Sequence, residues 1–163
     1  MVLAATIWAS VAVANGGCSK VSEASAGATS ALASPASSAV GPAGASYENA
    51  NYKAALKPLG GCKKEQPCAV EVVVEAKGDY HINEKYPYRF KTEDPAPQGL
   101  KYPKPVVGKE DGTMEEHKVT LKVPFIAGAS GDAKIAGTLS LSVCSAANCL
   151  MDKQPLEALV KVE

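Results

Sequence analysis

The feature that most constrains this chain is a two-residue alternation of apolar and other residues, interrupted by turns rich in Gly and Pro. It recurs along the chain after Tyr47, over residues 70–77, 86–90, 119–125, 135–143 and 156–162. A two-residue period is typical of β-strands that bury one face. No long stretch after Tyr47 has a convincing helical period, and residues 47–61 are expected to form only a short helical or irregular opening. The pattern predicts five or more short strands.

Several short strands separated by Gly/Pro turns, within one domain length, are typical of a sandwich of two antiparallel sheets. We therefore expect residues 47–163 to form a single all-β domain, an immunoglobulin-like β-sandwich. The only Trp, Trp8, lies outside this region. The sandwich is thus expected to lack the buried Trp of antibody domains.

The N-terminus has the pattern of an export signal. Residues 1–17, MVLAATIWASVAVANGG, form an apolar run that ends in small residues before Cys18 and is too short to span a membrane. The run resembles a bacterial lipoprotein signal. That resemblance implies a lipidated Cys18 and an anchor on the periplasmic face of a membrane, with Ser19 favouring the outer membrane. The alternative is cleavage after Ala14, which would leave a soluble periplasmic protein with a free Cys18.

The segment that follows, residues 18–46, consists almost entirely of Ala, Ser and Gly. Such a composition buries too little apolar surface to offset the entropy of ordering, so a disordered tether is expected.

The chain has five cysteines, an odd number that requires an explanation in an exported protein. Lipidation of Cys18 leaves four, which form two disulfides in an oxidising compartment. Three pairings are possible. Proximity along the chain favours Cys62–Cys68, as a structural disulfide at the start of the first long strand, together with Cys144–Cys149.

Several functional classes lack support. The net charge is zero, which argues against binding to nucleic acid, because a basic face is needed to neutralise phosphates. The cysteine spacings, CxxxxxC and CxxxxC, are not those of zinc sites. No Ser-His-Asp order, phosphate loop or pair of catalytic carboxylates is evident. No metal and no cofactor are expected.

The alternation also places the second cysteine pair. If Leu139, Leu141 and Val143 face the core, then Cys144 faces the other way, at the end of its strand. We expect its sulfur to be reachable by another protein. From the residues alone, a structural disulfide is the favoured interpretation, because most disulfides in exported domains are structural, and an exchangeable disulfide is the alternative.

Three segments carry a family resemblance: KGDYHINEKYPYRF (Lys77–Phe90), VTLKVPF (Val119–Phe125) and GTLSLSVCSAANCL (Gly137–Leu150). In this order they are similar to the N-terminal immunoglobulin-like domain of the thiol:disulfide interchange protein DsbD and to the related disulfide bond corrector domains. The resemblance covers nearly the whole expected domain.

This resemblance implies a thiol-disulfide interchange component, a protein-disulfide reductase, with Cys144 and Cys149 as its redox pair. It implies thioredoxin-like or other periplasmic thiol proteins as partners. It also implies a loop that caps the pair, here residues 108–114, with Glu110 and Asp111 as its acids and Met114 as its apolar cover. The alternative function is a non-catalytic exported binding or structural module in which both disulfides only stabilise the fold.

Overall fold

The structure, a computed structural model, describes residues 44–163. The expected signal, Cys18 and most of the expected tether lie outside these residues. At the C-terminal end of that tether, Gly44 forms a bridge with Leu156, and Ser46 begins the first strand. Within the described residues, no helix has the length and apolar character needed to cross a membrane.

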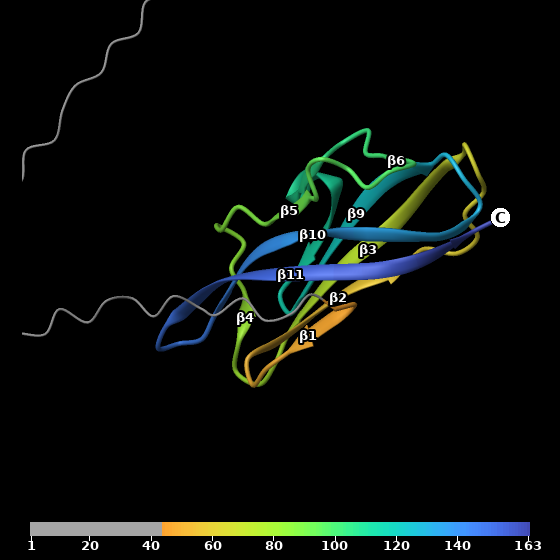
Figure 1. The fold of residues 1–163 in the computed structure, drawn as a ribbon. Helices are drawn as coiled ribbons and strands as arrows, with labels where there is room; N and C mark the ends of the chain where they lie inside the picture. Colours follow the sequence, from red (N-terminus) through yellow and green to blue (C-terminus); the bar gives the residue numbers. More distant parts are fainter. Residues whose placement is uncertain (1–43) are drawn as a thin grey trace, which may run out of the picture. The chain divides into compact units, whose positions relative to one another are not determined.

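The described chain forms two antiparallel sheets (Figure 1). Sheet B has the order β1-β2-β3-β9-β6, with β8 also paired to β9; sheet A has the order β11-β10-β5-β7, with β4 also paired to β10. The elements are β1 (Ser46–Glu48), β2 (Tyr52–Pro58), β3 (Pro67–Ala76), β4 (His81–Ile82), β5 (Arg89–Thr92), β6 (Leu100–Lys101), β7 (Val106–Gly108), the 3₁₀ turn η1 (Lys109–Asp111), β8 (Gly112–Glu115), β9 (Lys118–Ala127), β10 (Gly131–Cys144) and β11 (Cys149–Val162).

The strand order is that of an immunoglobulin domain. The constant-type domain has strands ABED in one sheet and CFG in the other. Here β2, β3, β9 and β8 are hydrogen-bonded in the order A-B-E-D, and β5, β10 and β11 in the order C-F-G. The expected all-β immunoglobulin-like sandwich is confirmed.

The core lies between the sheets and is filled by the apolar residues of the alternating strands. One side chain in two faces inward, as the two-residue period requires. The largest fully buried side chains come from both sheets: Tyr52, Val70, Val72, Val74, Leu121 and Phe125 from sheet B, and Phe90, Ile135, Leu139, Leu141 and Leu156 from sheet A, with Tyr88 just before β5.

The opening of the domain differs from the expectation. Residues 52–58, expected to be helical or irregular, form β2, which pairs with β3 over its full length. Its sequence, YKAALKP, is rich in residues with weak strand preference. Pairing with β3 and burial of Tyr52, Ala54 and Leu56 decide its conformation instead.

The outer face of sheet B carries rows of alternating charge. Across β2, β3 and β9, Lys57 lies opposite Glu71, which lies opposite Lys122. Four residues along each strand, Lys53, Glu75 and Lys118 form an equivalent row. Opposite charges on neighbouring strands favour a register and like charges disfavour it, so these rows support the register that buries the valines of β3.

Gly137 allows β5 and β10 to approach closely. A Cβ atom there would lie 2.5 Å from the carbonyl oxygen of Lys91 and 2.5 Å from the ring of Phe90. Because Phe90 is fully buried, the ring has little room to move away. The contact between Phe90 and the backbone of β10 therefore requires glycine.

We expect Gly137→Ala to lower the free energy of unfolding by about 1–3 kcal/mol, since the added methyl group overpacks the core. Urea denaturation measures this. The matched control is Gly61→Ala, because a Cβ atom at Gly61 meets nothing within 4 Å. Equal losses in the two variants would contradict the steric explanation.

Candidate functional site

The two cysteines near the C-terminus close the longest hairpin of the domain. Strands β10 and β11 pair over 14 residues each, and the last pair of the ladder is Cys144 opposite Cys149. The two residues form a disulfide, with their Cα atoms 4.0 Å apart. Cys62 and Cys68 form the other disulfide. The pairing favoured by sequence proximity is confirmed.

The disulfide Cys144–Cys149 lies on the outer face of sheet A. Leu139, Leu141 and Val143 are fully buried in the core. Cys144 projects from the opposite side of β10 because side chains alternate along a strand. This part of the sequence-based expectation is correct.

The accessibility expected from that placement is wrong for Cys144. Cys144 is only 7% exposed, and Ser142, on the same face, is fully buried. A segment preceding β5 lies beside this end of β10: His81 and Ile82 of β4 pair with Cys144 and Val143 in the same sheet. An outward-facing position is therefore not an exposed one here.

Two side chains hold the covering segment to β10. The backbone amide of Asn83 donates to the carbonyl oxygen of Ser142 at 3.1 Å, and the Asn83 side-chain amide donates to the Ser142 hydroxyl at 3.3 Å. The Tyr88 hydroxyl donates to the same carbonyl oxygen. No local pattern marks these contacts, because Asn83 and Tyr88 are each more than 50 residues from Ser142 in sequence.

The other half of the disulfide is accessible. Cys149 is exposed, as are Ala146, Ala147 and Asn148 in the connecting loop. Met151, the next residue of β11 on the same face, is 71% exposed. The bond therefore joins a buried residue, Cys144, to an exposed one, Cys149.

The hairpin loop has a defined hydrogen-bonded conformation. The Ser145 hydroxyl accepts from the backbone amides of Ala147 and Asn148 at 3.2 and 3.3 Å, and the Ser145 amide donates to the Asn148 carbonyl at 2.8 Å. Tyr80 donates from its hydroxyl to the Asn148 side-chain oxygen at 3.2 Å. Ser145 is of a residue type that favours such turns, whereas the contact with Tyr80 is non-local and has no sequence signal.

The segment Tyr80–Ile82 is also bonded to sheet B. The Ile82 amide donates to the carbonyl oxygen of Glu116 at 2.7 Å, and the Tyr80 carbonyl lies 3.0 Å from Nδ1 of His117. The cover over Cys144 is thus attached to both the hairpin and the turn before β9.

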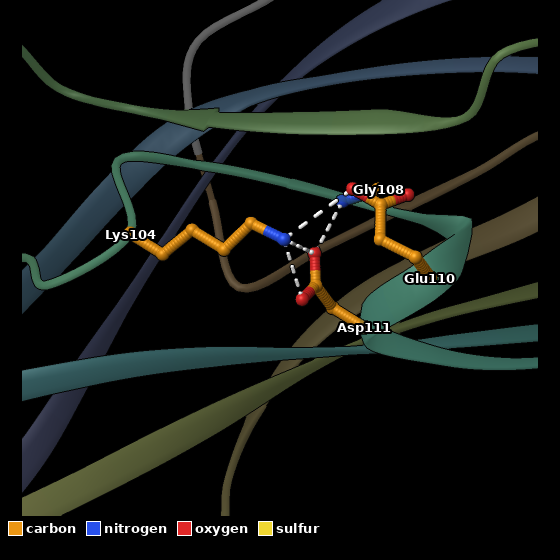
Figure 2. A network of polar contacts seen from close by, with 4 residues as sticks. All are labelled: Lys104, Gly108, Glu110 and Asp111. Atoms are coloured by element: carbon orange, nitrogen blue, oxygen red, sulfur yellow. Dashed lines mark hydrogen bonds and ion pairs between the residues drawn. The ribbon is translucent and has the colours of Figure 1, made fainter.

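The acids of the expected cap loop form a network within their own loop (Figure 2). The Lys104 ammonium group contacts the Asp111 carboxylate at 2.6 Å and the Glu110 carboxylate at 3.3 Å. The backbone amide of Gly108 donates to Asp111 at 2.9 Å. The Asp111 side chain is 22% exposed and that of Glu110 is 66% exposed, so Asp111 is the central acceptor.

Hydrogen bonding with Lys104 lowers the pKa of Asp111 and raises that of Lys104. The network therefore contributes stability above the ordinary carboxyl pKa and loses it as the pH falls through the lowered pKa. Solvent screens this pair strongly, so the contribution is small.

The third expected cap residue, Met114, is half-buried in β8, opposite Val119, and packs against the core. Thus the structure places Met114 in sheet B and Asp111 in a loop network. Shielding of Cys144–Cys149 by residues 108–114 stays a prediction.

The other disulfide, Cys62–Cys68, lies at the opposite end of the long hairpin. Cys62 is buried and bridges to Val162, and its carbonyl accepts from the Glu163 amide at 2.9 Å. Since β11 has 14 residues at about 3.3 Å each, the two disulfides lie roughly 40 Å apart along it. Residues 44–163 contain no group of three or more His, Cys, Asp or Glu side chains placed to hold a metal ion.

We expect Tyr88→Phe to lower the free energy of unfolding by about 1 kcal/mol at pH 8, because one buried hydrogen bond to Ser142 is lost. Burial raises the pKa of Tyr88 to about 12, whereas an unfolded tyrosine titrates near pH 10. The protonated hydroxyl therefore stabilises the wild type fully below about pH 10, and this advantage declines as the pH rises toward 12.

Urea denaturation of both proteins at pH 8 and about pH 11 measures the difference between them. The control is Tyr86→Phe, which removes a half-buried phenol whose ring packs edge-on against Tyr88 at 5.7 Å. A difference between wild type and Tyr88→Phe that grows with pH would contradict the assignment.

We expect Asp111→Ala to accelerate hydrogen exchange of the Gly108 amide by about fivefold, since its acceptor is removed. The reduction rate of Cys144–Cys149 by dithiothreitol, followed by mass spectrometry, is expected to stay unchanged. The control Glu110→Ala leaves both contacts of Asp111 in place. Faster reduction in both variants would instead support a capping role for this loop.

No protein-family model and no curated protein matches this chain. Among solved structures, the cohesin module from the Clostridium perfringens ATCC13124 family 33 glycoside hydrolase is 15% identical and aligns over 71% of this chain and 98% of its own, with a TM-score of 0.35. The ASH/PapD-like domain of human CEP192 (PapD-like domain 7) is 10% identical and aligns over 70% of this chain and 88% of its own, with a TM-score of 0.27. Similarity at this level carries no functional conclusion.

Proposed function

We propose that this domain exchanges its Cys144–Cys149 disulfide with thiols of other exported proteins, and that Cys149 is the residue attacked. The observation that carries the proposal is the unequal burial of the pair: Cys149 is exposed at the start of β11, and Cys144 is 7% exposed. Thiol-disulfide exchange requires an accessible sulfur, and the choice of sulfur determines which thiolate leaves.

The chemistry needs only a partner that carries a dithiol. Its thiolate attacks Sγ of Cys149, the Cys144–Cys149 bond breaks, and Cys144 leaves with the electron pair as a thiolate, which takes a proton from solvent. The partner's second thiolate then attacks its own sulfur in the mixed disulfide and releases the Cys149 thiolate. The partner is oxidised by two electrons and the domain is reduced, and the reverse sequence carries electrons to the partner.

The family resemblance supports the same function. The segment Gly137–Leu150 contains the cysteine pair directly after a strand, as in the N-terminal domain of DsbD and in disulfide bond corrector domains. By this resemblance the partners are thioredoxin-like or other periplasmic thiol proteins. The lipoprotein-like N-terminus, with Cys18 as the lipidated residue, would hold the domain at the periplasmic face of a membrane.

The second candidate is an exported binding or structural module with two structural disulfides. The burial of Cys144 favours it, because a cystine with one covered half resists exchange. The two candidates differ in reduction potential: structural disulfides of secreted proteins lie below about −300 mV and resist the glutathione pool.

We expect Cys144→Ala to trap a mixed disulfide at Cys149 when the protein is incubated with an oxidised thioredoxin-like protein. The converse variant, Cys149→Ala, leaves the buried Cys144 and is expected to trap at least about tenfold more slowly. Both variants carry Cys18→Ser, and adduct formation is followed by mass spectrometry.

Titration of the wild type against glutathione redox buffers completes the test. Exchange predicts a potential for Cys144–Cys149 above about −300 mV, while Cys62–Cys68 stays oxidised. A lower potential for Cys144–Cys149, with no trapped adduct in either variant, would establish the structural module instead.

A further inference from the structure

The outer face of sheet A presents three cationic side chains in register. Arg89 of β5 and Lys153 of β11 lie on either side of Ser140 of β10. Two residues along β5, Lys91 lies opposite Thr138 on the same face. All three cationic residues are exposed. The face therefore carries a basic strip across β5 and β11, formed by Arg89, Lys91 and Lys153.

The basic strip is continuous with the accessible half of the disulfide. Along β11 the residues on this face are Cys149, Met151 and Lys153, which places Met151 about 7 Å and Lys153 about 13 Å from Cys149. Met151 is 71% exposed, and Val106, opposite Lys91, is 40% exposed. Apolar surface and positive charge thus lie directly beside the sulfur that the proposed function uses.

Among the described residues, acidic groups border this strip but form no ion pair with it. Within residues 44–163, Arg89, Lys91 and Lys153 take part in no salt bridge. Two carboxylates border it and each is paired with another lysine: Glu110, whose carboxylate lies over Gly108, contacts Lys104 at 3.3 Å, and Glu157 contacts Lys134 at 2.8 Å. Two further acids, Glu93 and Asp94, lie beyond Lys91, away from the disulfide.

The charges on the outer face of sheet B can be compared with those on the outer face of sheet A. There, each central glutamate lies between two lysines, as in the row Lys57–Glu71–Lys122. In the equivalent rows of sheet A the central residues are Ser140 and Thr138, which carry no charge. In these rows an acid therefore separates the cations of sheet B, whereas no acid separates those of sheet A.

We infer that this face docks a thiol protein whose reactive cysteine is bordered by Asp and Glu side chains and by an apolar residue that packs on Met151. The inference rests on the proposed function and adds the chemistry of the partner. Complementary charge steers encounter and fixes orientation, so the basic strip brings the partner's thiolate to Cys149.

The test uses three synthetic peptides, each with one cysteine and one tryptophan, flanked by glutamates, glutamines or lysines. For each peptide, the rate of reducing Cys144–Cys149 is divided by the rate at which the same peptide reduces the uncharged disulfide of 2-mercaptoethanol. This ratio corrects for differences in thiol pKa between the peptides. We expect the glutamate peptide to be at least about tenfold faster than the lysine peptide at about 20 mM salt, and within about twofold at 1 M salt.

Two triple variants locate the effect. Arg89→Ser/Lys91→Ser/Lys153→Ser is expected to remove the preference, so that the glutamate and lysine peptides reduce the disulfide at rates within about twofold of each other at about 20 mM salt. The matched control, Lys57→Ser/Lys118→Ser/Lys122→Ser, removes the same charge from the face of sheet B and is expected to keep the preference. A preference that survives in the first variant, or disappears equally in both, overturns the inference.

A binding measurement separates this inference from the proposed function. The same peptides with Ser in place of Cys are titrated against the wild type, and binding is followed by tryptophan anisotropy. If no peptide reduces the disulfide but the glutamate peptide still binds through the basic strip, exchange fails and docking stands. Equal binding of glutamate and lysine peptides, or a basic strip occupied by a second copy of the chain in sedimentation experiments, overturns docking.

Discussion

The pairing of β10 with β11 is the interaction on which the rest of this structure depends. Its register buries Leu139, Leu141 and Val143 and, by the same alternation, puts Cys144 and Cys149 side by side on the outer face. A slip of one residue would move the side chains of the slipped strand to the opposite face, so the core and the position of the disulfide are specified together. At its other end, β11 bridges to Cys62, so both disulfides are positioned by this strand.

The two cysteines differ in burial because β10 has a third neighbouring strand, β4, beside Cys144. On one side β10 pairs with β11, which leaves Cys149 at the edge of the sheet; on the other side β4 pairs with Cys144. The hydrogen bonds that Asn83 and Tyr88 donate to Ser142 hold that cover in place. A symmetrical hairpin tip would expose both sulfurs equally. Here the fold buries Cys144 and leaves Cys149 exposed.

Features that depend on local alternation can be predicted from the sequence. Features that depend on contacts between residues distant in sequence cannot. Alternation is sufficient for the two-sheet class and for the face that Cys144 occupies, because each follows from the strand period. The burial of Cys144 depends on Asn83 and Tyr88, which no local pattern connects to Ser142. Likewise β2 is a strand because β3 pairs with it, although its Ala- and Lys-rich sequence has weak strand preference. The hydrogen bonds of Asp111 with Lys104 and Gly108 likewise have no signal in the local alternation.

The outer faces of the two sheets differ in the arrangement of their charges. On sheet B, lysines lie opposite glutamates and support the register. On sheet A, Arg89 and Lys153 lie two strands apart, at about 10 Å, a distance over which like charges still repel in dilute salt. Replacement of Ser140 by an acid would relieve that repulsion and would also cancel the positive field next to Cys149. If the acid that pairs with Arg89 and Lys153 belongs to a partner, the residue between them must be neutral, as Ser140 is.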